Sequence, residues 1–259
     1  MKIAASMRKV RAAGLSRDAQ VILAVLLTVV IGIWIDTRRL WFSQALADLV
    51  AWGVLLWVMG RAAAEERKQL VLCLLIATLG ECFLGFVWGL YQYRLGNLPL
   101  FIPPGHALVY AAGKRLRNLA PVWASLALAG VLGVVTTLGA LKGSDAQGLI
   151  WCPLFLSYLW LSRERSLYTA MFPLAVIIET YGTWMGGWTY HVREPWFGLS
   201  TITRPPVWTG TFYCTLDALV MLASRMPWTA RLVESLPALW RWAGKQSVVV
   251  EAASSTAEA

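Results

Sequence analysis

Hydrophobic side chains dominate eight segments of this chain, and short polar or charged stretches separate them. A membrane-spanning helix needs about 20 mostly apolar residues, because the hydrocarbon core of a bilayer is about 30 Å thick and each residue advances about 1.5 Å. The pattern therefore predicts an all-α, polytopic integral membrane bundle of about eight transmembrane helices. Two of the segments, the fourth and the sixth, are short, so six or seven spans are alternatives. The segments cover residues 19–35, 41–60, 69–90, 98–113, 121–141, 148–161, 167–187 and 206–223.

Composition agrees with a membrane protein, since 58% of the residues are hydrophobic and only 14% are charged. With eight spans, 17 of the 23 lysines and arginines flank the side that carries the N-terminus. Basic residues favour the cytoplasmic side, so both termini are predicted to lie in the cytoplasm, and a bacterial inner membrane is the expected location. The net charge of +9 suits an anionic lipid surface and does not indicate nucleic acid. The opposite side carries Arg38, Arg39, Arg94, Lys142, Arg193 and Arg204.

The two ends of the chain are expected to lie outside the bundle. Residues 1–18 form a basic cytoplasmic stretch, and the first apolar segment is expected to be retained because Asp36 to Arg39 follow it instead of a cleavage site. Residues 225–259 are expected to form an amphipathic interfacial helix, interrupted by Pro237, and a disordered polar tail.

One motif occurs twice, about 97 residues apart. The first copy reads Glu81-x3-Gly85-x3-Gly89-x3-Tyr93, and the second reads Glu179-x2-Gly182-x3-Gly186-x3-Tyr190. A diproline, Pro103-Pro104 or Pro205-Pro206, opens the following helix in each case. Four spans separate the copies, so the pattern predicts two parallel four-helix repeats, residues 19–120 and 121–224. Glycines at this spacing are also an ordinary helix-packing motif.

Four carboxylates interrupt the apolar segments: Asp48, Glu81, Glu179 and Asp217. An acidic side chain at the bilayer centre costs roughly 3 kcal/mol even on insertion scales, so such residues face a bundle interior and usually have a function. Counted along their helices, all four fall at similar depth on the side opposite the termini. The repeat favours Glu81 and Glu179 as the acid and base, with Asp217 as a third member, while Asp48 is as well explained by a structural role.

Other polar and aromatic residues gather on the same side. His106 follows a diproline and is a candidate proton carrier, although a lone histidine at a helix start is often structural. Aromatic faces stabilise cations, so rings here suit a carbocation intermediate, and an interfacial aromatic belt is the alternative explanation. The expected substrate-binding residues are Trp88, Tyr93, Trp184, Trp188, Tyr190 and Arg204.

Several kinds of site are excluded or disfavoured by residue counts. Two histidines cannot build a His-rich di-iron centre, and the four cysteines show no C-x-x-C spacing, so no metal site is predicted. A mid-membrane lysine for a retinal Schiff base is missing. No redox cofactor is implied, and the expected partners are the lipid bilayer and a lipid substrate.

The run from Glu81 to Tyr93, continuing through residues 98–103, resembles a signature of the membrane carotenoid-biosynthesis family, which includes carotenoid 1,2-hydratases. Residues 187–190 and 196–199 are similar to the second motif of that family. In place of an Asp-rich helix before that motif, this chain has Glu179 and its neighbours, and Thr201 to Thr203 stand where the family has an Asn. The resemblance implies addition of water to a terminal isoprenoid double bond, with Glu81 and Glu179 as the matching acids.

Three functions are compatible with these observations. The first is a membrane-embedded enzyme, of hydratase, lyase or isomerase type, that protonates a double bond of an isoprenoid lipid. The second is a proton- or cation-coupled transporter, since parallel repeats and buried acids also build carriers. The third is a structural or assembly protein whose acids only pair with neighbouring groups.

Overall fold

The computed structural model describes residues 16–38, 40–201 and 203–229, and the predictions for residues 1–15 and 230–259 lie outside this range. A helix covers each of the eight expected segments, with ends displaced by a few residues. Seven residues of π-helix, η1, continue α4, and a short 3-10 turn, η2 (Arg117–Leu119), follows α5. The α-helices are α2 (Arg17–Asp36), α3 (Ser43–Arg61), α4 (Ala64–Glu81), α5 (Ile102–Leu116), α6 (Val122–Leu141), α7 (Gly148–Leu161), α8 (Arg165–Met185) and α9 (Thr209–Ser224), and η1 is Cys82–Trp88.

Four of these helices are long and apolar enough to cross a membrane: α2, α3, α4 with η1, and α6. Between 22% and 33% of the residues in these four stretches are buried inside the protein, so most of their apolar surface faces outward. A soluble protein does not expose so much contiguous apolar surface, which supports a membrane environment. α7 is shorter but also apolar.

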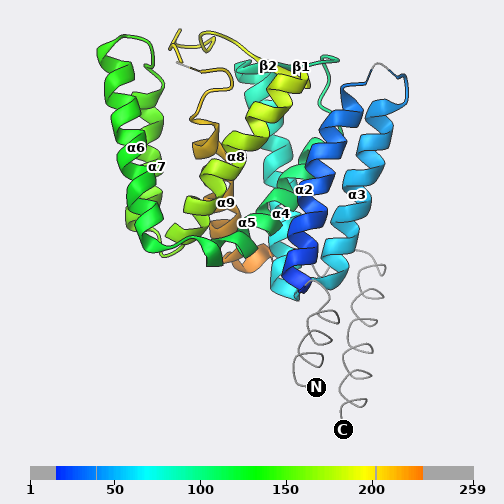
Figure 1. Cartoon of the computed structure of the whole chain (residues 1–259). Helices are drawn as coiled ribbons and strands as arrows, with labels where there is room; N and C mark the ends of the chain where they lie inside the picture. Colours follow the sequence, from blue (N-terminus) through cyan, green and yellow to red (C-terminus); the bar gives the residue numbers. More distant parts are fainter. Residues whose placement is uncertain (1–15, 39, 202, 230–259) are drawn as a thin grey trace, which may run out of the picture.

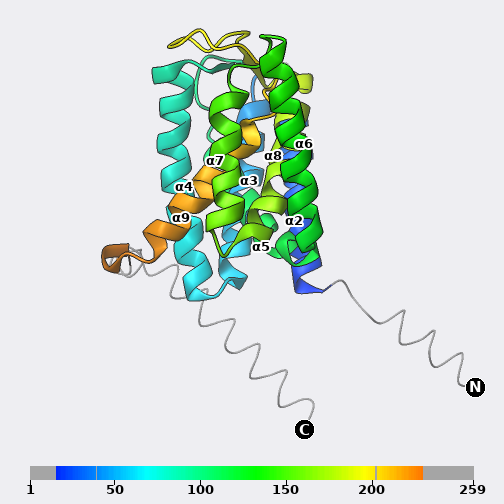
Figure 2. The same ribbon diagram turned by 90° about the vertical axis from the view of Figure 1, so that its left-hand side faces the viewer.

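The helices pack as a central group with a pair on each side (Figure 1). α4 packs against α5 and α9, and α8 packs against α5 and α9. The pair α2 and α3 flanks the group on one side, and the pair α6 and α7 flanks it on the other. Figure 2 shows α9 running obliquely between α4 and α7.

Two short strands join the two motif copies at one end of the bundle. Strand β1 (Tyr91–Tyr93) pairs antiparallel with β2 (Trp188–Tyr190), and Tyr91 lies opposite Tyr190. The structure is thus mostly helical, as predicted, with two short strands that the prediction did not include. The strand pair forms because Gly89 and Gly186 take left-handed conformations, with φ of 73° and 79°, and end the preceding helices. The motif tyrosines therefore lie on strands and not on helix ends.

The end of the bundle opposite the two strands is here called the far end. Helices α4 and α8 begin there, and ion pairs connect the helix ends. Arg115 of α5 contacts Glu66 of α4 at 2.7 Å, and Arg117 contacts Glu164, just before α8, at 2.8 Å. The Arg117–Glu164 pair is partly exposed, and a pair of that kind is worth about 0 to 1 kcal/mol. The structural meaning of the two pairs is that α5 ends beside the start of α4.

Candidate active site

A cavity of about 350 Å³ lies beside strands β1 and β2, between α4, α5, α8 and α9. Residues from α2, α3, η1 and α7 complete its wall, and most of them are apolar or aromatic, such as Ile33, Ala51 and Phe212. The volume falls within the usual range for a small-molecule site. Its polar lining is concentrated around Glu81 and Glu179, the two glutamates that the motif singled out.

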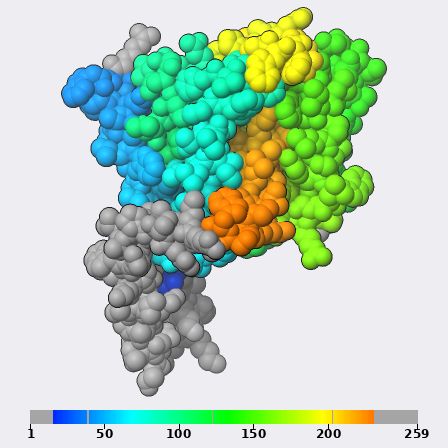
Figure 3. Space-filling model, turned by 180° about the vertical axis from the view of Figure 1, so that it is seen from behind, coloured from blue at the N-terminus to red at the C-terminus, as the bar shows by residue number. Residues whose placement is uncertain are grey.

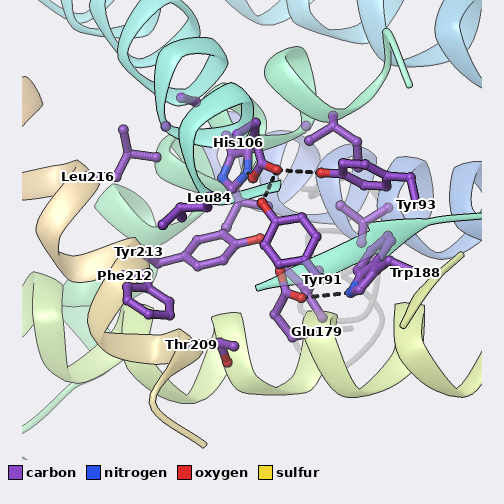
Figure 4. A pocket seen from close by; sticks show the side chains of 18 of the residues that line it. Leu84, Tyr91, Tyr93, His106, Glu179, Trp188, Thr209, Phe212, Tyr213 and Leu216 are labelled. Carbon is purple, nitrogen blue, oxygen red and sulfur yellow. Dashed lines mark hydrogen bonds and ion pairs between the residues drawn. The ribbon is translucent and has the colours of Figure 1, made fainter. Parts of the chain in front are cut away.

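Glu81, the last residue of α4, is buried and has three hydrogen-bond partners. The hydroxyls of Tyr91 and Tyr93, from β1, both donate to Oε2. His106 Nε2 lies 2.6 Å from Oε1. Figure 4 shows His106, Tyr91 and Tyr93 close together in the wall of the cavity.

Glu179 of α8 is bound in the same manner. Trp188 Nε1 and the Tyr190 hydroxyl, from β2, donate to Oε2 over 2.8 Å each, and the Tyr213 hydroxyl donates to Oε1 over 2.9 Å. Each glutamate thus takes two donors from the strand that follows it and a third from the next helix. The third partners are the fifth residues of their helices, His106 in α5 and Tyr213 in α9.

The two half-sites are in direct contact. The rings of Tyr91 and Tyr190 lie 5.2 Å apart, and those of His106 and Tyr213 lie 4.7 Å apart. The chain therefore forms one site from both motif copies, and the principal difference between its halves is an imidazole in one and a phenol in the other.

Two buried polar atoms of the cavity wall have no hydrogen-bond partner among the described residues, His106 Nδ1 and Thr209 Oγ1. Buried polar groups are normally satisfied, so such exceptions indicate where a ligand or water binds. With Nε2 bound to Glu81, only Nδ1 of the imidazole is available to exchange a proton with a molecule in the cavity. Thr209 lies on the Glu179 side of the site (Figure 4).

The motif glycines give the aromatic donors room. A Cβ on Gly182 would lie 2.1 Å from the Trp188 ring, so only glycine admits the indole that binds Glu179. A Cβ on Gly85 would lie 3.5 Å from Tyr91, which is ordinary contact. In the second copy of the motif, Gly182 therefore serves both helix packing and the placement of the Trp188 indole that binds Glu179.

A loop above the cavity is organised by Glu194, which the sequence did not single out. Its carboxylate accepts the backbone N–H groups of Trp196, Phe197 and Leu199, and the indole of Trp88 on η1 over 2.8 Å. Burial would raise the pKa of this carboxyl, but the hydrogen bonds from Trp88 and the three backbone groups lower it below its usual value. The ring of Trp196 stacks on Trp88 at 5.2 Å, so the loop packs against a residue of the cavity wall.

The predicted site residues separate into two groups. Seven of them line the cavity: Glu81, Glu179, His106, Trp88, Tyr93, Trp188 and Tyr190. Asp217 is fully buried but does not line it, and neither does Asp48. Trp184 is 78% exposed on the outer face of α8, and Arg204 is exposed in the loop before α9, so neither is among its lining residues.

Two lining residues that bind the glutamates, Tyr91 and Tyr213, are not among the predicted site residues. The Tyr-Gln-Tyr alternation of residues 91–93 was the available signal, because alternate residues of a strand share a face. Tyr213 had no such signal, since its position depends on how α9 packs against α8. Comparison of the chain with models of protein families, with curated proteins and with solved structures gave no significant match.

Proposed function

We propose that this protein is an integral membrane enzyme that performs acid–base chemistry on a double bond of an isoprenoid-type lipid. The observation that carries the proposal is the constellation of Glu81, Glu179 and His106 in the wall of an otherwise apolar cavity. Acid–base catalysis needs a donor and an acceptor on the same substrate, and an apolar wall suits a hydrocarbon. The resemblance to the carotenoid-biosynthesis family points to the same chemistry.

In the proposed reaction, the Glu81–His106 pair donates a proton from Nδ1 to one carbon of the double bond. The resulting cation forms at the other carbon, beside the rings of Tyr91 and Tyr213 and the charge of Glu179. Aromatic faces stabilise a cation by about 0.5 to 2 kcal/mol each. A water bound by Thr209 then attacks the cation and loses its proton to Glu179, which completes hydration. Loss of a neighbouring carbon-bound proton to Glu179 gives isomerisation instead.

The form of the cavity supports a substrate from the lipid phase. Its wall on one side consists of partly or largely exposed apolar residues of η1, α7 and α9, among them Phe83, Leu154 and Leu219. Viewed from behind, α9 lies recessed between α4 and α7 (Figure 3). A hydrocarbon chain entering between these helices reaches the glutamates without crossing water.

Membrane topology belongs to the same proposal. We place all eight helices in the membrane as two parallel four-helix repeats, with the far end facing the cytoplasm. The placement of α2 and α3 beside one half of the central group, and of α6 and α7 beside the other, supports the repeat. Lys114, Arg115 and Arg117 at the far end support the orientation, because basic residues favour the cytoplasmic side.

The test is deuterium uptake. Purified protein in lipid nanodiscs is incubated with an acyclic polyene that ends in an isoprene unit, in D₂O, and the lipid extract is analysed by mass spectrometry. The wild type is expected to incorporate carbon-bound deuterium. Glu81→Gln, Glu179→Gln and His106→Gln should each reduce the rate by about 100-fold or more, the usual contribution of an acid–base group.

The matched control is Asp48→Asn, which removes a carboxylate from an apolar helix outside the cavity and should retain the wild-type rate. Wild-type rates in both folded glutamate variants would overturn the assignment of the site. Uptake of a lipid or cation into vesicles without chemical change would favour the transporter instead.

A further inference from the structure

One buried acid has no part in the chemistry proposed above. Asp217 of α9 is 0% exposed, and neither of its carboxylate oxygens has a hydrogen-bond partner among the described residues. An unpaired carboxylate in a water-free interior is far too costly to persist, whereas the neutral acid is tolerated. Asp217 therefore holds a proton in this arrangement.

Polar side chains lead from the site past Asp217 to the far end of the bundle. They recur at intervals of four residues on three packed helices, so the members on each helix share one face, about 6 Å apart. α4 packs against both α5 and α9, which brings the three rows together. The rows are Glu81, Cys73 and Gln69 on α4, with Ala77 at the remaining position; His106, Tyr110 and Lys114 on α5; and Tyr213 and Asp217 on α9.

The groups around Asp217 can take part in proton transfer but cannot neutralise a negative charge. Those close enough to be affected by it are the thiols of Cys73 and Cys214 and the phenols of Tyr110 and Tyr168. They come from α4, α9, α5 and α8, the four helices of the central group. None is cationic, so this layer is not an ion pair that merely stabilises the fold.

Tyr110 connects this layer to the protein surface. Its hydroxyl donates to Gln69 Oε1 over 3.1 Å, and Lys114 Nζ donates to the same oxygen over 2.6 Å. Gln69 and Lys114 are half-buried at the far end, whereas Tyr110 is only 1% exposed. The phenol oxygen keeps lone pairs that can accept a hydrogen bond from the Asp217 acid.

We propose that Asp217 is the proton-exchange residue of the site, and that it exchanges with water at the far end by way of Tyr110. The inference rests on the proposed function, in which one turnover removes a proton from the Glu81–His106 pair and leaves one on Glu179. Asp217 gives its proton to the depleted pair as it takes one from Glu179 or from far-end water, so it is not left charged. No net proton and no electron is consumed. The steps from Asp217 to Tyr213 along α9 and from Tyr110 to His106 along α5 are each about one helical turn, short enough for a single water to bridge.

Infrared spectroscopy tests the proton exchange of Asp217 without requiring the protein to convert a substrate. The wild type in nanodiscs at neutral pH should show a protonated-carboxyl band that disappears in Asp217→Asn. On transfer to D₂O this band should shift as the acid exchanges its proton. Tyr110→Phe keeps the ring but removes the hydroxyl, and it should slow that exchange by about tenfold or more, as expected when roughly 1.4 kcal/mol is added to a barrier.

The control is Tyr181→Phe, because the Tyr181 hydroxyl donates to the backbone carbonyl of Val30 on α2 over 3.1 Å, outside the central group of helices. This variant should exchange at the wild-type rate. Asp217→Asn should also lower deuterium uptake into the lipid, less severely than Glu81→Gln.

A wild-type spectrum without an Asp217 acid band, or equal exchange in wild type and Tyr110→Phe, would overturn the proposal. Asp217→Asn serves to assign the band, and Asp217→Glu, which keeps the acid but should shift its band, gives a second assignment should Asp217→Asn fail to fold. If no lipid is turned over but the band and its exchange behave as expected, only the proposed reaction fails.

Discussion

Single residues decide how the two halves of the site differ. Glu81 and Glu179 accept equivalent sets of hydrogen bonds, but His106 binds one and Tyr213 the other. An imidazole has two ring nitrogens, so it can bind Glu81 with one and a substrate with the other, whereas a phenol has a single hydroxyl. The side with His106 is therefore suited to donate a proton and the side with Tyr213 to hold a charge.

Glu194 provides a prediction at the same scale. Glu194→Gln replaces one acceptor oxygen with an NH₂ group that faces backbone N–H donors, so the loop over the cavity should detach and the midpoint of thermal unfolding should fall. Because the pKa of Glu194 is lowered in the folded protein, its stabilisation is complete above the unfolded value of about 4.3. It is lost as the pH falls through the folded value.

The measurement is thermal unfolding in detergent as a function of pH. The difference between wild type and Glu194→Gln should be largest above about pH 5 and should shrink on acidification below the ordinary glutamate pKa. Glu65→Gln, on the exposed start of α4, is the matched control. A difference that grows on acidification would contradict the role given to Glu194.

At the scale of elements, the positions of the helices follow from hydrophobicity, but the shape of the site does not. The apolar segments and the two motif glutamates could be found in the sequence because each is a local pattern. A single alternation such as Tyr-Gln-Tyr is too short to predict a strand, and η1 differs from an α-helix only in its hydrogen bonding. The Glu81–His106 contact joins residues 25 apart through the packing of α4 on α5, which no local pattern reveals.

Substitution of the motif glycines can distinguish what the local sequence pattern predicts from what the packing of the helices determines. By sequence Gly85 and Gly182 are equivalent, but only the second is packed against an aromatic ring closely enough to exclude a methyl group. Gly182→Ala should displace Trp188 and destabilise the protein by about 1 to 3 kcal/mol, as overpacking does. Gly85→Ala should stay within about 1 kcal/mol of wild type, because alanine is at least as good a helix former.

Thermal unfolding of the two variants, together with deuterium uptake, checks this expectation. Gly182→Ala should lose activity along with stability, because Trp188 is a donor to Glu179. Equal effects of the two alanines would show that the glycines act only as a general packing motif.

At the scale of the whole molecule, the outward-facing apolar surface and the enclosed cavity are consequences of one arrangement. Helices that face lipid need no polar face, so their polar residues are free to gather inside. This is why Glu81, Glu179 and Asp217 could be predicted to be interior. Which of them share a cavity depends on helix rotation, and sequence depth alone wrongly placed Asp217 with the glutamates.

The accessibility of the cysteine thiols tests how the helices are rotated about their axes. Cys82 on η1 is exposed, whereas Cys73, Cys152 and Cys214 are buried. A small lipid-soluble maleimide should therefore label one thiol in the folded protein and four after denaturation, as counted by intact mass. Cys82→Ala should abolish labelling of the folded protein, and rapid labelling of a second thiol would contradict this packing.

The pairing of β1 with β2 has a consequence for how the two motif copies can vary. A symmetric dimer of a half-length chain would carry the same residue at both positions that correspond to His106 and Tyr213. In a single chain these positions mutate independently, so one copy can keep a proton donor while the other specialises. Joining the two copies in one polypeptide is thus what permits two similar half-sites to hold different chemical groups.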